Sequence, residues 1–209
     1  MASKPSPPGD PGGTPAFSRR SFLKTAGVGA AATTMVGVGA RQAAQVLGPD
    51  AVGLSLKVNG AVRQVSVEPR VTLLEALRNH LDLTGAKEVC DRGACGACTV
   101  LLDGEPVDSC LMLAADAEGH EITTVEGLGT PEKMSPLQAA FVEKDAMQCG
   151  FCTPGFVVSG TALLAKVPSP TLEQIKAHLA GNLCRCGTYG RVFEAVRAAA
   201  ASAKPAKRG

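Results

Sequence analysis

The chain has 209 residues, which is enough for one domain of medium size or two small ones. Its formal net charge is +2, and its 21 lysine and arginine residues are scattered, so no basic stripe indicates a nucleic-acid partner. Aromatic residues make up 3% of the chain, which is few for a large hydrophobic core. Small domains with weak cores usually depend on a disulfide, a metal or a partner. The eight cysteines are the candidates for that role.

Residues 1–50 have the composition of a targeting region rather than of a folded domain. Residues 1–17 are rich in Pro, Gly and Ser, which predicts disorder. The pair Arg19-Arg20 then precedes a mildly apolar stretch at 25–40. A basic segment, a short apolar segment and a small-residue end are the parts of a signal peptide, with Val38-Gly39-Ala40 as a possible cleavage site. The stretch is too short and too rich in glycine to form a stable membrane span.

The adjacent arginines favour the twin-arginine export route over the general secretory route. The twin-arginine route carries folded proteins, so a cofactor inserted in the cytoplasm survives export. We therefore expect a periplasmic protein whose mature chain begins after about residue 40. The alternative is that two arginines precede an amphipathic helix by chance.

The mature region opens with the signals of a β-hairpin and a short helix. Two runs with alternating apolar residues, 53–58 and 61–67, are separated by Asn59-Gly60, which is the strongest short-range hairpin signal. The sequence Thr72-Leu73-Leu74-Glu75 has the pattern of a capping box and predicts a helix to about Leu81.

A loop that carries the first cysteines follows this helix. Beyond it we expect a strand at 99–102, a turn at Asp103-Gly104 and another strand around 121–125. Hairpin, helix, loop and second hairpin together predict a small α+β domain over residues 51–125.

After residue 125 the pattern changes to helices. Three start signals are Ser135-Pro136, Thr153-Pro154 and Thr171-Leu172-Glu173-Gln174. Gly181 is a suitable stop for the third helix, and a last helix is expected from Tyr189 to about Ala203. The predicted second domain is an all-α four-helix domain at 126–203, followed by a lysine-rich tail at 204–209 that we expect to fray.

The cysteines divide along the same boundary. The first group has the spacing C-x4-C-x2-C…C of a plant-type [2Fe–2S] site and consists of Cys90, Cys95, Cys98 and Cys110. The second group lies in the helical half and consists of Cys149, Cys152, Cys184 and Cys186. Four thiolates must converge in pairs on two irons, which requires a backbone that turns sharply, and Gly93 and Gly96 supply this freedom in the first loop.

Two other interpretations of the cysteines remain open. A disulfide framework suits an exported chain, but three cysteines in one short glycine-containing loop cannot easily pair with one another or with distant partners. Structural zinc also accepts four thiolates, although two C-x2–4-C pairs are more typical of it. The functional alternatives are a zinc-stabilised interaction module and a free-standing ferredoxin or redox sensor.

Three ordered motifs make the iron–sulfur interpretation specific: Cys90–Val100, Gln148–Gly155 and Gly181–Cys186. Together they resemble the iron–sulfur small subunit of the xanthine dehydrogenase and aldehyde oxidoreductase family of molybdenum hydroxylases. With the twin-arginine signal, the resemblance is greatest to the small subunits of bacterial periplasmic aldehyde oxidoreductases. The chain departs from many relatives at Gly187-Thr188-Tyr189, where they have Thr-Gly-Tyr.

The resemblance implies a ferredoxin-like β-grasp domain with a plant-type [2Fe–2S] cluster, followed by a four-helix domain with a second [2Fe–2S] cluster. It implies a partner large subunit whose molybdopterin cytosine dinucleotide hydroxylates an aldehyde or an N-heterocycle. Electrons would leave through the helical-domain cluster, then the plant-type cluster, then an FAD-binding medium subunit or a cytochrome acceptor. Gln148 and Cys186 would lie against the pterin.

The chain itself carries no catalytic motif. It has no glycine-rich dinucleotide fingerprint, no P-loop and no zinc-protease motif. His80, His120 and His178 are isolated in the sequence, and no catalytic role is assigned to them. We therefore expect an electron-transfer subunit that is inert towards aldehydes when it is alone.

Overall fold

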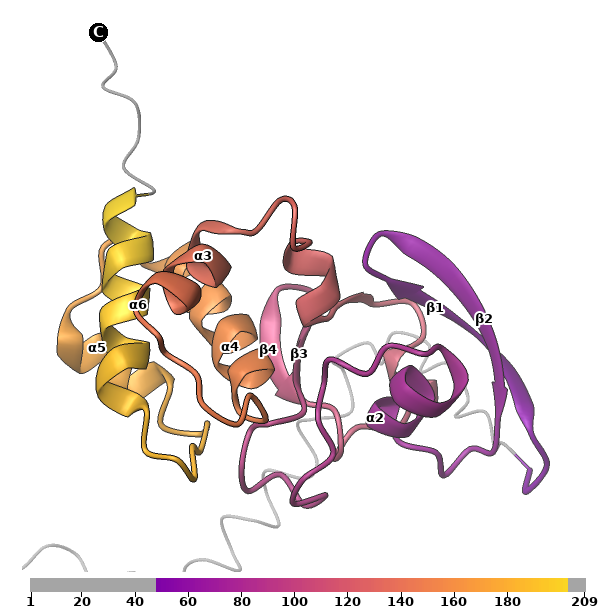
Figure 1. The fold of residues 1–209 in the computed structure, drawn as a ribbon. Coiled ribbons are helices and arrows are strands. Elements are labelled where there is room, and N and C mark those ends of the chain that lie inside the picture. Colours follow the sequence, from indigo (N-terminus) through magenta and orange to yellow (C-terminus); the bar gives the residue numbers. More distant parts are fainter. Residues whose placement is uncertain (1–47, 203–209) are drawn as a thin grey trace, which may run out of the picture. The chain divides into compact units, whose positions relative to one another are not determined.

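A computed structural model of the chain describes residues 48–202 (Figure 1). The predictions of a disordered N-terminus, a signal peptide with its cleavage site and a frayed tail at 204–209 lie outside the described residues. No helix within 48–202 has the length and apolar character needed to cross a membrane.

The first half is built on a mixed five-stranded sheet with the order β2-β1-β5-β3-β4. The central pair β1 and β5 is parallel, and the other pairs are antiparallel. The strands are β1 (Val52–Val58), β2 (Ala61–Val67), β3 (Thr99–Leu102), β4 (Glu105–Asp108) and β5 (Glu121–Thr123).

The predicted hairpin of β1 and β2 is confirmed. Val58 pairs with Ala61, so Asn59 and Gly60 form a two-residue turn. Their φ angles are 52° and 78°, both in the left-handed region that this kind of turn requires. Asn and Gly adopt this conformation at lower cost than other residues, which explains why the turn forms here.

The predicted capping box at Thr72 is also confirmed. The Glu75 N–H donates to Thr72 Oγ1 (3.2 Å), and the Thr72 N–H donates to Glu75 Oε2 (3.1 Å). The helix that follows has two parts, α2 (Leu73–Glu75) and a π-helical turn η2 (Ala76–His80). Figure 1 shows α2 beside the sheet, and its leucines are fully buried in the core that the sheet and the helix share.

The structure differs from the sequence prediction at the second hairpin. Strand β3 pairs with β5, and on its other side it pairs with β4. The sequence did not indicate β4, because Glu105-Pro106-Val107-Asp108 contains a proline and two acids. An edge strand tolerates the missing N–H of a proline, and β4 is an edge strand. The strand predicted around 121–125 is shorter, because a 3₁₀ turn, η4 (Val125–Leu128), follows β5.

The second half contains four helices, as predicted: α3 (Pro136–Glu143), α4 (Thr153–Lys166), α5 (Leu172–His178) and α6 (Tyr189–Ser202). Capping boxes open α3 and α5, at Ser135 and Thr171. The α+β fold class, with a half built on a sheet followed by a helical half, is confirmed.

Two details of the helical prediction are wrong. Thr153 is the first residue of α4 rather than its cap, and its Oγ1 is buried without a hydrogen-bond partner. Cys152 takes the cap position, because the chain enters the helix directly from the cysteine loop. The helix α5 ends at His178 and is closed by Leu179, so Gly181 is not its stop.

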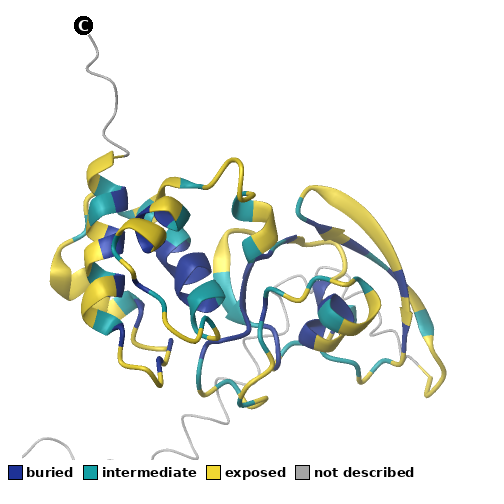
Figure 2. Cartoon of the chain, in the orientation of Figure 1, coloured by how far each residue is buried: buried dark blue, intermediate teal, exposed yellow. Residues whose placement is uncertain are grey.

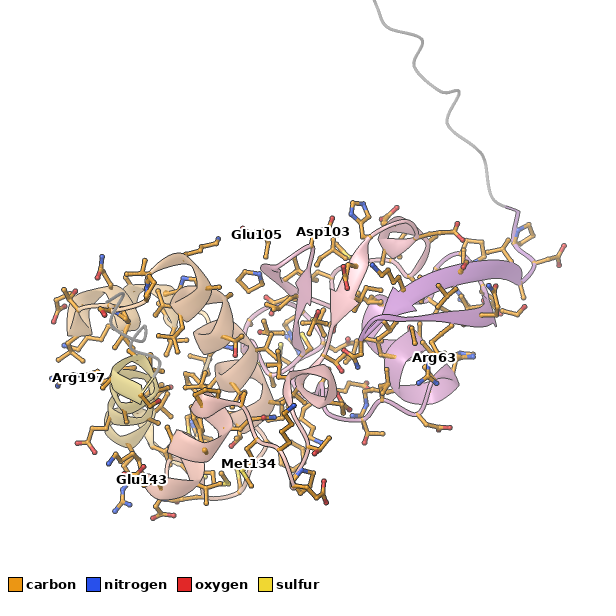
Figure 3. All side chains as sticks on the ribbon, turned by 90° about the horizontal axis from the view of Figure 1, so that it is seen from above. Arg63, Asp103, Glu105, Met134, Glu143 and Arg197 are labelled. Atoms are coloured by element: carbon orange, nitrogen blue, oxygen red, sulfur yellow. The ribbon has the colours of Figure 1, made fainter. Side chains whose placement is uncertain are left out.

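Helix α4 connects the two halves. It packs on β3 through a small cluster of buried residues, Leu101, Val158 and Ala162. Figure 2 shows α4 as largely buried, in contrast to the exposed outer faces of α5 and α6. At the edge of this contact Lys166 Nζ meets Glu105 Oε2, and Figure 3 labels Glu105 at this place. The halves therefore share a packed interface that brings their cysteine loops together.

Candidate metal centres

The first three cysteines lie on a loop between η2 and β3 that turns sharply. Asp91, Gly93 and Gly96 have φ angles of 51°, 63° and 66°. Because of these turns, backbone N–H groups point at cysteine sulfurs: Gly93 N–H donates to Cys110 Sγ and Ala94 N–H donates to Cys90 Sγ, both at 3.3 Å. Such donors stabilise the negative charge of thiolate ligands.

The four thiols of the first group interact in two pairs, Cys90 with Cys95 and Cys98 with Cys110. The backbone N–H of Arg92 has the largest part in lowering the pKa of Cys90 to about 7. Burial raises the pKa of Cys95, and burial with the neighbouring Cys110 raises the pKa of Cys98 to about 12.

The second group contains an adjacent pair, the half-buried Cys152 and the buried Cys184. Burial, and then the neighbouring Cys184, raise the pKa of Cys152 to about 12. Burial also acts to raise the pKa of Cys184. The hydroxyl and the N–H of Thr188 outweigh this effect, with smaller contributions from Cys152 and the Cys186 N–H, and the pKa of Cys184 is lowered to about 7. Cys149 and Cys186 are exposed.

The two cysteine loops are joined directly. The Leu183 N–H, next to Cys184, donates to the carbonyl of Cys95 (2.9 Å). The buried amide of Asn182 donates to the Gly96 carbonyl (2.9 Å). A Cβ at Gly155, in the first turn of α4, would lie 2.1 Å from the same Gly96 oxygen, so only glycine allows this approach.

Each cysteine group is flanked by exposed apolar side chains. Val89 and Leu111 are 56% and 67% exposed next to Cys90 and Cys110. Phe151 and Leu183 are 57% and 52% exposed beside the second group. Large apolar side chains that are exposed near a functional centre are typical of surfaces that a partner covers.

The remaining residues singled out in the sequence have other surroundings. Gln148 is exposed directly before Cys149. His120 Nδ1 lies 2.5 Å from Asp103 Oδ2, which Figure 3 labels, and His178 Nε2 lies 3.1 Å from the Ser159 carbonyl. Within residues 48–202 no three His, Cys, Asp or Glu side chains are grouped so as to hold one ion.

These surroundings fit iron–sulfur clusters. All eight cysteines lie in the part of the chain that the structure describes, and each is a free thiol. Pairs of thiols suit a binuclear cluster, in which each iron takes two protein ligands, and the N–H donors at 3.3 Å suit sulfur ligands that carry charge.

Sequence reasoning missed two supporting residues, Asn182 and Thr188. Both are buried polar residues beside a cysteine, and both touch the cysteine loops through their side chains. The signal was present, because both lie within or next to the Gly181–Cys186 motif. Their side chains are not of the types that bind iron, so they were not counted as site residues.

Comparison with known proteins agrees with this geometry. A family model for a 2Fe-2S iron-sulfur cluster binding domain matches residues 56–125, and one for a [2Fe-2S] binding domain matches 124–197. A third, for the twin-arginine translocation pathway signal sequence, matches 16–36.

Curated relatives cover most of the chain. The aldehyde oxidoreductase iron-sulfur-binding subunit PaoA of Escherichia coli O157:H7 is 40% identical over 206 residues, which is 90% of each chain. The nicotine 6-hydroxylase small subunit of Paenarthrobacter nicotinovorans is 52% identical over 147 residues, 70% of this chain and 88% of the relative.

Solved structures give the same result. In quinoline 2-oxidoreductase from Pseudomonas putida 86, one chain superposes with a TM-score of 0.71 and 43% identity, covering 73% of this chain and 96% of that one. The aldehyde oxidoreductase from Desulfovibrio gigas superposes with a TM-score of 0.70 and 41% identity, covering 74% of this chain but only 18% of that longer one. The chain therefore belongs to the iron–sulfur small subunits of the xanthine dehydrogenase and aldehyde oxidoreductase family of molybdenum hydroxylases, and is the non-catalytic, electron-transferring subunit of such an enzyme.

Proposed function

We propose that the chain holds one [2Fe–2S] cluster on Cys90, Cys95, Cys98 and Cys110 and a second on Cys149, Cys152, Cys184 and Cys186, and conducts electrons between two partner subunits. When bound, each cluster supplies a centre that accepts and releases one electron. The observation that carries the proposal is the hydrogen bond from the Leu183 N–H to the Cys95 carbonyl, which links a ligand loop of one group to that of the other.

The chain's own residues exclude water from part of each group. Cys98 and Cys110 are 2% and 5% exposed, and Cys184 is 7% exposed. Cys149 and Cys186 remain open to solvent, so the second group faces outward on one side. This side is available to a cofactor of another subunit.

The outward side supports a direction of electron flow. We assign it to the large subunit, whose molybdopterin cytosine dinucleotide would lie near Gln148 and Cys186. The first group, with Val89 and Leu111 exposed beside it, would face the acceptor, an FAD-binding subunit or a cytochrome. The substrate, an aldehyde or an N-heterocycle, would bind to the large subunit, because small subunits similar to this chain carry different substrates in their names.

Two single cysteine variants, one in each group, test the ligand assignment. Cys95→Ser should remove the plant-type cluster and Cys152→Ser the helical-domain cluster, so each variant of the purified complex should lose half of the iron and one of two electron paramagnetic resonance signals. Colourless protein that contains zinc and does not bleach with dithionite would instead support the zinc-stabilised interaction module.

Partner and location need separate experiments. Purification of the native complex should yield a large subunit with molybdenum and an acceptor subunit with FAD or haem, and isolation of a stable monomer alone would favour a free-standing ferredoxin. Gln148→Ala should slow electron transfer out of the molybdenum centre without loss of iron.

Replacement of Arg19 and Arg20 by lysine should retain the protein in the cytoplasm, whereas the unaltered chain should reach the periplasm.

A further inference from the structure

The hydroxyl of Thr188 contacts a cysteine sulfur. Its Oγ1 lies 3.2 Å from Cys184 Sγ. Both residues are buried, with 5% of Thr188 and 7% of Cys184 exposed. An electrostatic contact is stronger in such surroundings than in water, because little solvent competes for either atom.

The local backbone fixes the hydroxyl in this place. Gly187 has a φ of 78°, which suits glycine and turns the chain after Cys186. Thr188 then accepts a hydrogen bond from the Val192 N–H through its carbonyl (3.0 Å), which starts α6. The order Gly187-Thr188 therefore gives the left-handed position to glycine and points a β-branched hydroxyl side chain back at the cysteine.

A second contact holds the other partner. The Cys184 N–H donates to the hydroxyl of Tyr189 (2.9 Å), and the Tyr189 ring packs edge-on against Phe156 of α4. Cys184 is thus held from both sides by adjacent residues of one turn.

Iron binding determines which atom donates. In the free thiol either atom can be the donor. A cysteine that binds iron has lost its proton, so the hydroxyl must donate and the sulfur must accept. A hydrogen bond to a charged acceptor is stronger than one between neutral groups.

We propose that the Thr188 hydroxyl raises the reduction potential of the helical-domain cluster by donating a hydrogen bond to Cys184 Sγ. This inference rests on the proposed function, in which Cys184 is an iron ligand. Reduction adds negative charge to the cluster and its ligand sulfurs, and a donor at a sulfur stabilises the more negative state. Thr188 makes this cluster a better electron acceptor without itself binding iron.

The test is an anaerobic redox titration of the purified complex, followed by electron paramagnetic resonance, for Thr188→Val and Thr188→Ser. Valine has nearly the shape of threonine without the hydroxyl. We expect Thr188→Val to lower the reduced-to-oxidised ratio of the helical-domain cluster at a fixed potential by about three- to tenfold. For a one-electron couple this is a downward shift of about 30 to 60 mV. Thr188→Ser should keep the potential of the unaltered protein.

Two controls belong to this titration. Thr161→Val removes a hydroxyl that donates to the Val157 carbonyl within α4 (2.8 Å), so it should leave both potentials unchanged. The plant-type cluster of the Thr188→Val complex is an internal control and should keep its potential as well.

The outcomes separate this inference from the proposed function. Absence of two [2Fe–2S] signals from the unaltered complex would refute the proposed function. Two signals with no shift in Thr188→Val, or an equal shift in Thr188→Ser, would refute only the role of Thr188. If Thr188→Val and Thr188→Ala both lose the helical-domain cluster while Thr188→Ser keeps it, the contact serves cluster retention and the inference is likewise overturned.

Discussion

The Leu183 N–H donates a hydrogen bond to the Cys95 carbonyl across 2.9 Å. The two residues belong to different halves of the chain, and each is part of a cysteine loop or adjoins a cysteine. A path made of covalent bonds and this one hydrogen bond therefore connects the two cysteine loops.

Gly155→Ala should disrupt the contact between the halves. The new Cβ would lie 2.1 Å from the Gly96 carbonyl oxygen. The oxygen belongs to the backbone and the backbone also fixes the position of a Cβ, so neither atom can turn away. Overpacking of this kind costs about 1–3 kcal/mol of unfolding free energy. Urea unfolding of the full chain, followed by circular dichroism, measures the loss. The control is Gly190→Ala in the first turn of α6, because a Cβ there would meet no atom of another segment within 4 Å, so this change should not lower the unfolding free energy. Equal stability of the Gly155→Ala variant and the unaltered protein would contradict the prediction.

Asn182→Ala should loosen the two cysteine loops. The Asn182 amide donates to the Gly96 carbonyl (2.9 Å) and to Thr99 Oγ1 (3.3 Å), and the residue is 5% exposed. Loss of both bonds should cost about 1–3 kcal/mol. In the loaded complex the magnetic coupling between the clusters should also weaken, which a purely local loss of stability would not cause. Asn79→Ala, at an exposed position of η2, should change neither quantity.

Two threonine-to-valine changes should differ in their effect on the free energy of unfolding. The Thr99 hydroxyl donates to the Gly96 carbonyl (2.7 Å), so Thr99→Val should lose about 1–3 kcal/mol of unfolding free energy. The Thr153 hydroxyl oxygen is buried without a partner, so Thr153→Val should be neutral or stabilising. Both variants are compared by urea unfolding of the full chain. A clear destabilisation by Thr153→Val would mean that its hydroxyl is bonded after all.

Asp103→Asn should reduce stability in a way that depends on pH. The hydrogen bond with His120, and then the Glu121 N–H, hold the pKa of Asp103 below its usual 3.8. A carboxyl with a lowered pKa stabilises the folded state above its unfolded pKa, and this stabilisation is lost as the pH falls through the folded pKa. The variant should therefore be less stable than the unaltered chain at pH 7 and at pH 5, and the difference should vanish at pH values well below 3.8.

Thermal unfolding at several pH values measures this effect. Asparagine suits the left-handed backbone of residue 103, where φ is 50°, so backbone strain does not obscure the comparison. Asp50→Asn, at an exposed position before β1, is the matched control for the loss of one carboxylate. A stability difference that persists unchanged in acid would contradict the role of the Asp103 charge.

Local signals in the sequence predicted the elements well. The Asn59-Gly60 turn and the caps at Thr72, Ser135 and Thr171 were read correctly, because each depends on hydrogen bonds between residues only a few positions apart. The strand β4 was missed, because its pairing with β3 outweighs its weak strand composition. The prediction that Thr153 caps α4 is wrong, since the pattern Thr-Pro does not reveal how the preceding cysteine loop enters this helix.

The spacing of the eight cysteines alone predicts two groups of four, and which half of the chain carries each group. Spacing along the chain is a local property, so it can be read directly. Three features become visible only in the folded chain: which thiols adjoin one another, the contact of Asn182 with Gly96 from 86 residues away, and the position of the Thr188 hydroxyl at the Cys184 sulfur. These contacts arise from the packing of α4 on β3 and from the exact turn of the backbone after Cys186, and side-chain packing between distant segments has no signature in local sequence spacing.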